Sequence, residues 1–486
     1  MKKKFLSAIV AAACLTSVSA VSMPAVNAAV DGNLEYKLVD FDKDGRLDYA
    51  VITGCDSTAT SLTIPATFEN YQVRGIEDDA FANNKVLEEF TVSDNNLYFT
   101  QVGGVLFSKD SETLVCYPSA KKQNTKYTIP SAVKYIANNA FINNKTLTEV
   151  VLPSSVNSIG SSAFEECVNL EKVSIPSSVE SIGRDAFWDT KLLENQIKNE
   201  QGPIYYADSW IIYSDSNIET VMSDSKAIKV GTVGIAGGAF TEHQKLSLVD
   251  IPASIRYISE FAFYDCDELT SVKFPSAIKI IGQGAFENCD RLTELTLPDT
   301  LGSLGAEAFK NCTKLARVNI PTSIKNIAAS LFEGSAIVAA DLPANIESIE
   351  SRAFANCPNL HNVTIRNKDC AIVDQPDTIS NSGTLYNGTI TGYSGSTAQT
   401  YTNSLNRTFD SLGGNGELPS TGFEQGDANH DGAINVMDAS FIARKLSQKK
   451  VSELPESADY NGDNKINVMD ASAIARDLAS GKLKKK

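Results

Sequence analysis

A phenylalanine that returns every 23 residues constrains this chain more than any other feature of its sequence. The series is Phe141, Phe164 and Phe187, then, after a break, Phe240, Phe263, Phe286, Phe309, Phe332 and Phe354, and within these two blocks one step is 22 residues. A matching series of prolines is Pro130, Pro153, Pro176, Pro252, Pro275, Pro298, Pro321 and Pro343. Together with Phe81 and Pro65, which mark an earlier unit, these series give ten copies. A fixed period of this length predicts a solenoid of stacked units.

One unit shows how the solenoid is built. Leu170, Val173 and Ile175 alternate as in a short strand, and Pro176 ends it because proline has no amide hydrogen for the ladder. Ile182 belongs to a second inward-facing pair before the next phenylalanine. A single unit has too few apolar residues for a core of its own, so neighbouring units must supply the core by stacking.

Several units resemble a known repeat family. The segments "IPSSVESIGRDAFWDTKLL" and "LPDTLGSLGAEAFKNCTKLARVNIP" are similar to the BspA-like leucine-rich repeats of bacterial surface and secreted proteins. The resemblance covers roughly residues 33–410. It implies a curved, β-rich solenoid that contacts other molecules and has no catalytic centre, and it does not fix the ligand. We assign residues 29–410 to this solenoid.

Two insertions interrupt the period, between Phe81 and Phe141 and between Phe187 and Phe240. Both contain alternating apolar runs that predict hairpins, "GGVLFSKDSETLVCY" and "PIYYADSWIIYS". The second insertion also brings aromatic residues together: Trp188, Tyr205, Tyr206, Trp210 and Tyr213. We favour a small core of the insertion for this cluster; the alternative is a platform that stacks on a sugar or a protein.

Five cysteines occupy one position of the repeat, three residues after the phenylalanine: Cys167, Cys266, Cys289, Cys312 and Cys357. A position shared by stacked coils has the same surroundings each time, which predicts small buried fillers with free thiols. A disulfide or a metal role is the alternative, because cysteines of secreted proteins often pair.

The last part of the chain contains two near-copies, "GDANHDGAINVMDASFIARKLS" and "ADYNGDNKINVMDASAIARDLA". Each places oxygen-bearing groups at positions 1, 3, 5, 7, 9 and 12 of a twelve-residue loop, position 7 through its backbone carbonyl. The first set is Asp427, Asn429, Asp431, Ala433, Asn435 and Asp438, and the second is Asp459, Asn461, Asp463, Lys465, Asn467 and Asp470. Hard oxygen ligands at this spacing predict two calcium ions.

This pair of loops, each followed by a helix and each ending in Asp instead of the usual Glu, resembles a type I dockerin. The resemblance covers residues 426–483, a small all-α module that follows a flexible linker at 411–425. It implies that the partner is a cohesin module of a scaffoldin. It also implies the contact residues Val436, Met437, Ala443, Arg444, Val468, Met469, Ala475 and Arg476. Because many clostridial members carry hydroxyl residues where this chain has Val-Met, a more apolar contact is expected. The near-identity of the copies predicts that either can face the cohesin.

The ends and the charge of the chain bear on its location. Three lysines, an apolar stretch and the small residues Val26 and Ala28 predict a signal peptide over residues 1–28. A membrane anchor is the alternative, disfavoured because the apolar stretch is short. The net charge of −16 argues against nucleic acid, which requires a basic face. We therefore expect a secreted, extracellular protein without a membrane span.

These features together predict a non-catalytic adaptor in a cellulosome-like, polysaccharide-degrading assembly. A hydrolase accessory with carbohydrate-binding activity is less favoured, since the chain has three histidines and no evident nucleophile motif. A cell-surface adhesin is suggested by "LPSTG" at 418–422, a sortase-like string, but a polar module follows it instead of a hydrophobic span. The acidic string "DFDKDGRLD" at 40–48 resembles a calcium loop but lacks an acid at position 12, so a hairpin turn is preferred.

Overall fold

The structure is a computed structural model, and it divides into two compact units between Leu412 and Gly413. It describes residues 26–122, 125–199, 202–221, 228–414, 428, 434, 436–447, 454, 458–461, 465–480 and 482. We call residues up to 412 the solenoid unit and residues from 413 the C-terminal unit. The predicted signal peptide lies outside the described residues except for its last three, which begin strand β1 (Val26–Asp31).

The solenoid unit begins with a five-stranded sheet in the order β1-β2-β3-β6-β5. Its further strands are β2 (Leu34–Val39), β3 (Tyr49–Cys55), β5 (Thr67–Phe68) and β6 (Tyr71–Ile76). Beside it, β4 (Ser61–Ile64) pairs in parallel with β7 (Glu89–Val92). The turn between β2 and β3 carries the acidic string, so the predicted hairpin is confirmed.

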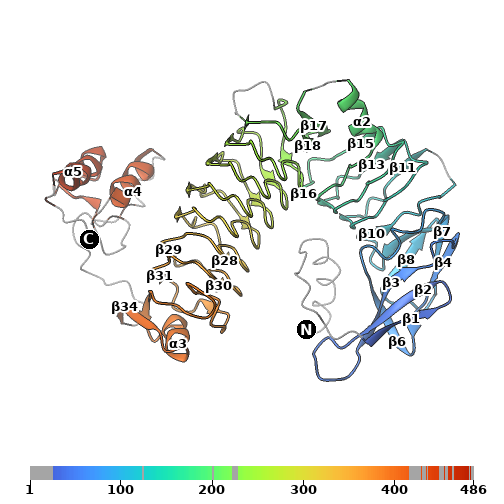
Figure 1. Cartoon of the computed structure of the whole chain (residues 1–486), viewed down its shortest axis with the longest axis horizontal. Helices are drawn as coiled ribbons and strands as arrows, with labels where there is room; N and C mark the ends of the chain where they lie inside the picture. Colours follow the sequence, from blue (N-terminus) through green and yellow to red (C-terminus); the bar gives the residue numbers. More distant parts are fainter. Residues whose placement is uncertain are drawn as a thin grey trace. The chain divides into compact units, whose positions relative to one another are not determined.

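Beyond this sheet each repeat forms one coil with two strand positions, and strands of successive coils lie side by side in two rows (Figure 1). The row that precedes the prolines holds β11 (Lys126–Thr128), β13 (Glu149–Val151), β15 (Lys172–Ser174), β19 (Thr220–Val221), β21 (Leu248–Asp250), β23 (Ser271–Lys273), β25 (Glu294–Leu295), β27 (Arg317–Val318), β29 (Ala339–Leu342) and β31 (Asn362–Ile365). The second, short-strand row holds β12 (Tyr135–Ile136), β14 (Ser158–Ile159), β16 (Ser181–Ile182), β20 (Gly234–Ile235), β22 (Tyr257–Ile258), β24 (Ile280–Ile281), β26 (Ser303–Leu304), β28 (Asn326–Ile327), β30 (Ser348–Ile349) and β32 (Ala371–Ile372).

Within each uninterrupted block of both rows, paired residues lie one sequence period apart along the chain. Val150 pairs with Val173, and Ile159 pairs with Ile182, both in parallel and 23 residues apart. The repeating phenylalanines stack ring on ring inside the coils, with centroids 4.8 Å apart for Phe141 and Phe164 and 5.1 Å apart for Phe263 and Phe286. The β-rich solenoid is therefore confirmed, with one continuous ladder of rings within each block of coils.

The buried thiols follow the same period. All five repeat cysteines are free and inaccessible to solvent. Each thiol donates to the carbonyl oxygen of the phenylalanine in the preceding coil, as Cys167 does to Phe141 at 3.1 Å and Cys312 to Phe286 at 3.1 Å. The predicted small buried fillers are thus also hydrogen-bond donors between coils.

Both insertions form the predicted hairpins. The first contains β8 (Phe99–Val102), β9 (Val105–Ser108) and β10 (Thr113–Cys116), and the second contains β17 (Ile204–Ala207) and β18 (Trp210–Ser214). Both join the short-strand row, because β10 pairs with β12 and β18 pairs with β20. The second also carries a helix, α2 (Lys191–Lys198), which was not predicted.

The solenoid unit ends with β33 (Thr389–Ser394), helix α3 (Thr397–Ser404) and β34 (Thr408–Gly414). This segment closes the last coil with a regular helix. Arg407 lies between the rings of Tyr386 and Tyr401 and donates to backbone carbonyls, including that of Ile379. These contacts cover the open end of the core.

The described part of the C-terminal unit consists of two helices, α4 (Val436–Ser447) and α5 (Val468–Ala479). Their shared core contains Ala428, Ile442, Leu454, Ala458 and Ile474. The all-α module is confirmed. No helix in the described ranges combines the length and the apolar character that crossing a bilayer requires.

Candidate functional site

The second loop of the C-terminal unit is organised around the carboxylate of Asp470, which is fully buried. One carboxylate oxygen accepts from the amide of Asn461 at 3.2 Å, and the other accepts from the amide of Asn467 at 2.8 Å. Asn467 caps α5, and its side chain accepts from the amide of Met469 at 2.9 Å. Loop positions 3, 9 and 12 are therefore drawn together at the start of the helix.

The remaining predicted ligands are only partly within the described residues. Asp459 and Asn461 precede the loop's turn, and the carbonyl oxygen of Lys465 accepts from the side chain of Asn467 at 3.1 Å. Asp463 lies outside the described residues. Of the first loop's predicted ligands only Asp438 is described, again fully buried in the first turn of its helix. Its companions Asp427, Asn429, Asp431, Ala433 and Asn435 lie outside.

These residues fit a hard cation. A buried carboxylate is strongly unfavourable unless charge or hydrogen bonds compensate it, and Asp438 and Asp470 are both at zero exposure at equivalent positions. The donor set around Asp470 consists of carboxylate, amide and carbonyl oxygens, the ligands that calcium takes.

The predicted contact residues lie on the helices. Val468 and Met469 are 62% and 55% exposed at the start of α5, and Ala475 and Arg476 are exposed two turns later. Ala443 and Arg444 are exposed at the matching positions of α4. Val436 and Met437 begin that helix, and their side chains lie outside the described part. Because positions i and i+7 of a helix share a face, Val468 and Ala475 lie on one exposed strip.

The aromatic residues of the second insertion do not form a single platform. Trp210 is fully buried and stacks across Gly234 on Tyr257, two strands away, with ring centroids 6.0 Å apart, and Tyr205 is also buried. Tyr206 is half-buried, and its hydroxyl accepts from the amide of Lys229 at 3.0 Å. The cluster is therefore mainly a core, as favoured from the sequence. Trp188 and Tyr213 keep partly exposed faces.

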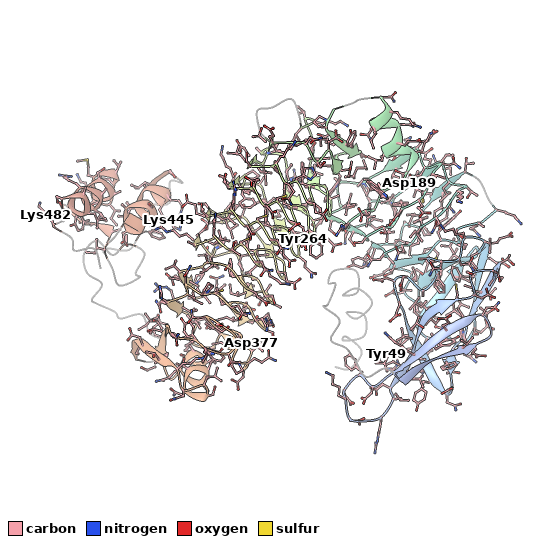
Figure 2. The ribbon with its side chains drawn as sticks, viewed as in Figure 1. Tyr49, Asp189, Tyr264, Asp377, Lys445 and Lys482 are labelled. Carbon is pink, nitrogen blue, oxygen red and sulfur yellow. The ribbon has the colours of Figure 1, made fainter. Side chains whose placement is uncertain are left out.

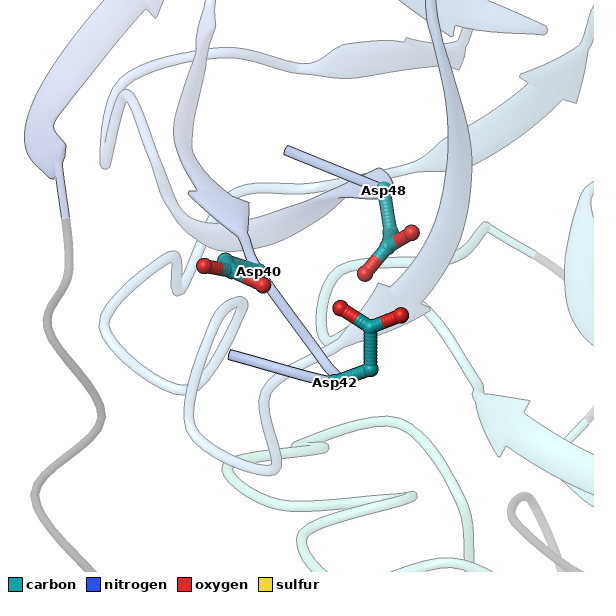
Figure 3. A group of neighbouring side chains, drawn as sticks. All are labelled: Asp40, Asp42 and Asp48. Carbon is teal, nitrogen blue, oxygen red and sulfur yellow. The ribbon is translucent and has the colours of Figure 1, made fainter. Parts of the chain in front are cut away.

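The acidic turn brings three carboxylates together. Figure 3 shows Asp42 and Asp48 pointing toward one another with Asp40 beside them, and their nearest oxygens all lie within 4.8 Å. The turn also uses these groups itself, since Asp40 accepts from the amide of Gly45 at 2.8 Å and Asp48 from the amide of Phe41 at 2.7 Å. These bonds close a hairpin turn, as expected.

One pair resembling a catalytic dyad was missed from the sequence. The Ser214 hydroxyl lies 3.0 Å from Nε2 of His243, and Nδ1 of His243 lies 2.9 Å from the carbonyl oxygen of Thr241. Both side chains are buried, and the serine hydroxyl also lies within 2.6 Å of the Ala239 carbonyl. His243 stands three residues after Phe240, at the repeat's cysteine position, so the pair is part of the core. The period could have identified it.

Comparisons with known proteins agree with this division. The model of the BspA type leucine-rich repeat region matches in six copies over residues 54–194, 112–233 and 233–361, and the dockerin type I domain matches residues 425–479. No curated protein sequence matches.

Solved structures of bacterial leucine-rich repeat proteins are similar to the solenoid. One from Bacteroides ovatus is 18% identical over an alignment that covers 75% of this chain and 70% of the Bacteroides chain, with a TM-score of 0.29. One from Eubacterium ventriosum is 24% identical, covering 58% of this chain and 60% of its own, with a TM-score of 0.23. A leucine-rich cell surface protein from Faecalibacterium prausnitzii is 22% identical, covering 80% and 99%, with a TM-score of 0.24.

Proposed function

Because this chain belongs to the BspA-type leucine-rich repeat family and carries a type I dockerin domain, we propose that it is a secreted, non-catalytic adaptor. Its C-terminal unit binds a cohesin module of a scaffoldin, and its solenoid presents a recognition surface within a cellulosome-like, polysaccharide-degrading assembly. The observation that carries the proposal is the pair of buried carboxylates, Asp438 and Asp470, each at the last ligand position of a dockerin loop.

In this proposal two calcium ions shape the docking surface. Each loop contributes its oxygen ligands at positions 1, 3, 5, 7, 9 and 12, so one ion neutralises the acids that would otherwise repel one another. The helix after each loop begins at the last ligands, as the Asn467 cap of α5 shows. Ion binding and helix position are therefore linked, and docking should require calcium.

The cohesin contact is proposed to be apolar at its centre. Val468 and Met469 are large apolar side chains held in solvent, which is typical of a surface that a partner covers. The first copy carries the same Val-Met pair at 436 and 437. Two equivalent surfaces would allow docking in either of two orientations.

The decisive experiment measures calorimetric affinity of the full chain, in calcium, for a panel of scaffoldin cohesins. Met469→Lys and Met437→Lys alone should each leave affinity within a few-fold of wild type, and the double variant should lose about a hundredfold or more. Leu385→Lys, which likewise replaces an exposed apolar side chain by lysine but lies in the solenoid unit, serves as the charge-matched control. A double variant that binds like wild type would refute this contact surface, and a single variant that abolishes binding would refute dual orientation.

Secretion is proposed from the predicted signal peptide and would be tested by sequencing the N-terminus of exported protein. A mature chain beginning near Ala29 is expected. Recovery of the uncleaved chain in the membrane fraction would contradict it.

A further inference from the structure

Three hollows on the short-strand row of the solenoid unit share lining residues and so form one groove. Their volumes are about 370, 660 and 160 Å³. Asp78 and Asn138 line both the first and the middle hollow, and Arg184 and Asp185 line both the middle and the third. We call this continuous depression the short-strand groove.

The first end of the groove is aromatic. Tyr49, Tyr98 and Phe41 line it, and the Arg74 guanidinium lies 5.5 Å from the ring centroid of Tyr49 and 5.7 Å from that of Tyr98. Nε of Arg74 is buried and has no acceptor among the described residues. This end therefore offers aromatic rings beside a guanidinium group. Figure 2 labels Tyr49.

The middle of the groove combines serine hydroxyl groups with apolar side chains. Ser161, Ser181 and Ser303 line it, together with glycines of the stacked coils. A Cβ on Gly183 would lie 2.3 Å from the amide nitrogen of Ser161, and one on Gly282 would lie 2.6 Å from that of Glu260. Close stacking of the coils thus excludes side chains at these positions and leaves a smooth surface that presents hydroxyl groups.

The third hollow is aromatic again. Trp188 is 45% exposed and meets the edge of Tyr213 at 5.4 Å between centroids. Beside it, Arg184 and Asp185 form an ion pair at 3.3 Å. Trp188 immediately precedes Asp189, which Figure 2 labels. Aromatic faces therefore stand at both ends of a middle stretch that carries serine hydroxyl groups.

Charge and hydrogen bonding narrow the class of ligand. Acidic side chains outnumber basic ones in the groove, which disfavours an anionic polymer. The basic residues are Arg74 and Arg184, and the acidic residues are Asp48, Glu77, Asp78, Asp185, Glu242 and Glu260. A peptide that adds as a strand along β14, β16 or β24 would need a free sheet edge there. Strands β14 and β24 have partners on both sides, and at β16 the Ile182 amide donates to Ser259 and its carbonyl accepts from Gly237.

We propose that the short-strand groove binds a neutral polysaccharide chain. Sugar rings have apolar C–H faces that pack on aromatic side chains, and their hydroxyl groups exchange hydrogen bonds with serine, carboxylate and guanidinium groups. The rings of Tyr49, Tyr98 and Trp188 hold the chain at its ends, and the serine hydroxyl groups contact it between. This deepens the proposed function by giving the adaptor's recognition surface a ligand class.

The test uses the full-length chain in calcium, titrated calorimetrically with cellohexaose, xylohexaose and mannohexaose, and with hexagalacturonate as the anionic comparison. At least one neutral hexasaccharide should bind, and hexagalacturonate should bind more weakly. Tyr98→Ala and Trp188→Ala should each weaken that binding about tenfold. Tyr98→Phe and Trp188→Phe keep a ring and should stay within about threefold, as should Leu385→Ala, an exposed apolar control outside the groove.

Three outcomes would overturn the proposal: no binding of any neutral hexasaccharide, wild-type affinity in both alanine variants, or tighter binding of hexagalacturonate. Because Tyr98 is half-buried, thermal melting accompanies each titration, and the exposed Trp188 provides an independent variant. Cohesin affinity is measured on the same samples. Loss of sugar binding with cohesin docking intact would count against the groove proposal alone. Failure of docking with sugar binding intact would count against the proposed adaptor function alone.

Discussion

At the scale of single residues, the position three after each phenylalanine connects one coil to the one before it. Five cysteine thiols donate there to a phenylalanine carbonyl, and Asn144 donates to the carbonyls of Pro118 and Ser119. The donors differ in chemistry but satisfy the same kind of buried acceptor. Unsatisfied buried carbonyls are unfavourable, so a hydrogen-bond donor at this position stabilises the contact between coils.

Burial of these thiols makes the solenoid sensitive to alkaline pH. Burial raises the pKa of Cys312 from its ordinary value near 9.0 to about 12. An unfolded thiol loses its proton above about pH 9, and a folded one retains it, so stability present below pH 9 declines as pH rises toward 12. The decline is about 1.4 kcal/mol per pH unit for each such thiol.

Cys312→Ala should therefore lower the free energy of unfolding at pH 7 by about 1–2 kcal/mol, because it removes a hydrogen bond and leaves a small void. Between pH 9 and 11 it should lose stability less steeply than wild type. Urea unfolding at a series of pH values measures both effects. Thr313→Ala, an exposed neighbour without a titrating group, should keep the wild-type slope, and an unchanged slope in Cys312→Ala would contradict the explanation.

At the scale of elements, the turn around each repeating phenylalanine contains two residues with left-handed backbone conformation. One lies two residues before the phenylalanine, and the other lies two residues after it. Asn139 and Asn143 flank Phe141 with φ of 57° and 64°, and Gly238 and Glu242 flank Phe240 with 68° and 59°. The same pair recurs through Phe354. Most residues other than glycine and asparagine resist this conformation by roughly 1–2 kcal/mol, so the coil contains a strained site wherever another residue stands there.

Two identical substitutions should separate this strain from other effects of glycine. Glu242→Gly relieves a left-handed position, whereas Glu171→Gly removes a side chain from an exposed position outside the left-handed set. We expect Glu242→Gly to be the more stable of the two by about 1–2 kcal/mol. Chemical unfolding of both variants measures the difference, and equal midpoints would show that the turn is not strained.

The period, the apolar ladder and both hairpins follow from the sequence because each is a local pattern repeated or flanked by turn residues. The left-handed pairs were missed, since residues as different as Phe261 and Arg352 occupy the same position and only tertiary stacking requires it. Helices α2 and α3 were missed because each has eight residues, too few for a clear periodic pattern. The short-strand groove joins residues as distant as Asp78 and Ser303, and no single repeat predicts it.

At the scale of the whole molecule, the two units depend on different sources of stability. The solenoid unit has a core that continues from coil to coil, so its stability accumulates along the chain. The C-terminal unit has only five buried apolar side chains in its core among its described residues. Three of them are large, Ile442, Leu454 and Ile474, and the other two are alanines. The core of a domain this small supplies little stability alone, so such domains commonly add disulfides, metal or a partner, and its described residues contain no cysteine.

Removal of calcium should therefore unfold one unit and leave the other intact. After treatment with EDTA, hydrogen exchange followed by mass spectrometry should show loss of protection in α4 and α5, because the buried carboxylates of Asp438 and Asp470 lose the cation that compensates them. Peptides from β13 and β14 should keep their protection, since Val150 and Ile159 lie in the stacked core. Asp470→Ala should reproduce the loss in α5 even with calcium present, whereas Asp477→Asn, which changes a carboxylate outside the loop, should not. Recovery with calcium but not with magnesium would confirm the ion, and undiminished protection of α5 without metal would refute the coupling.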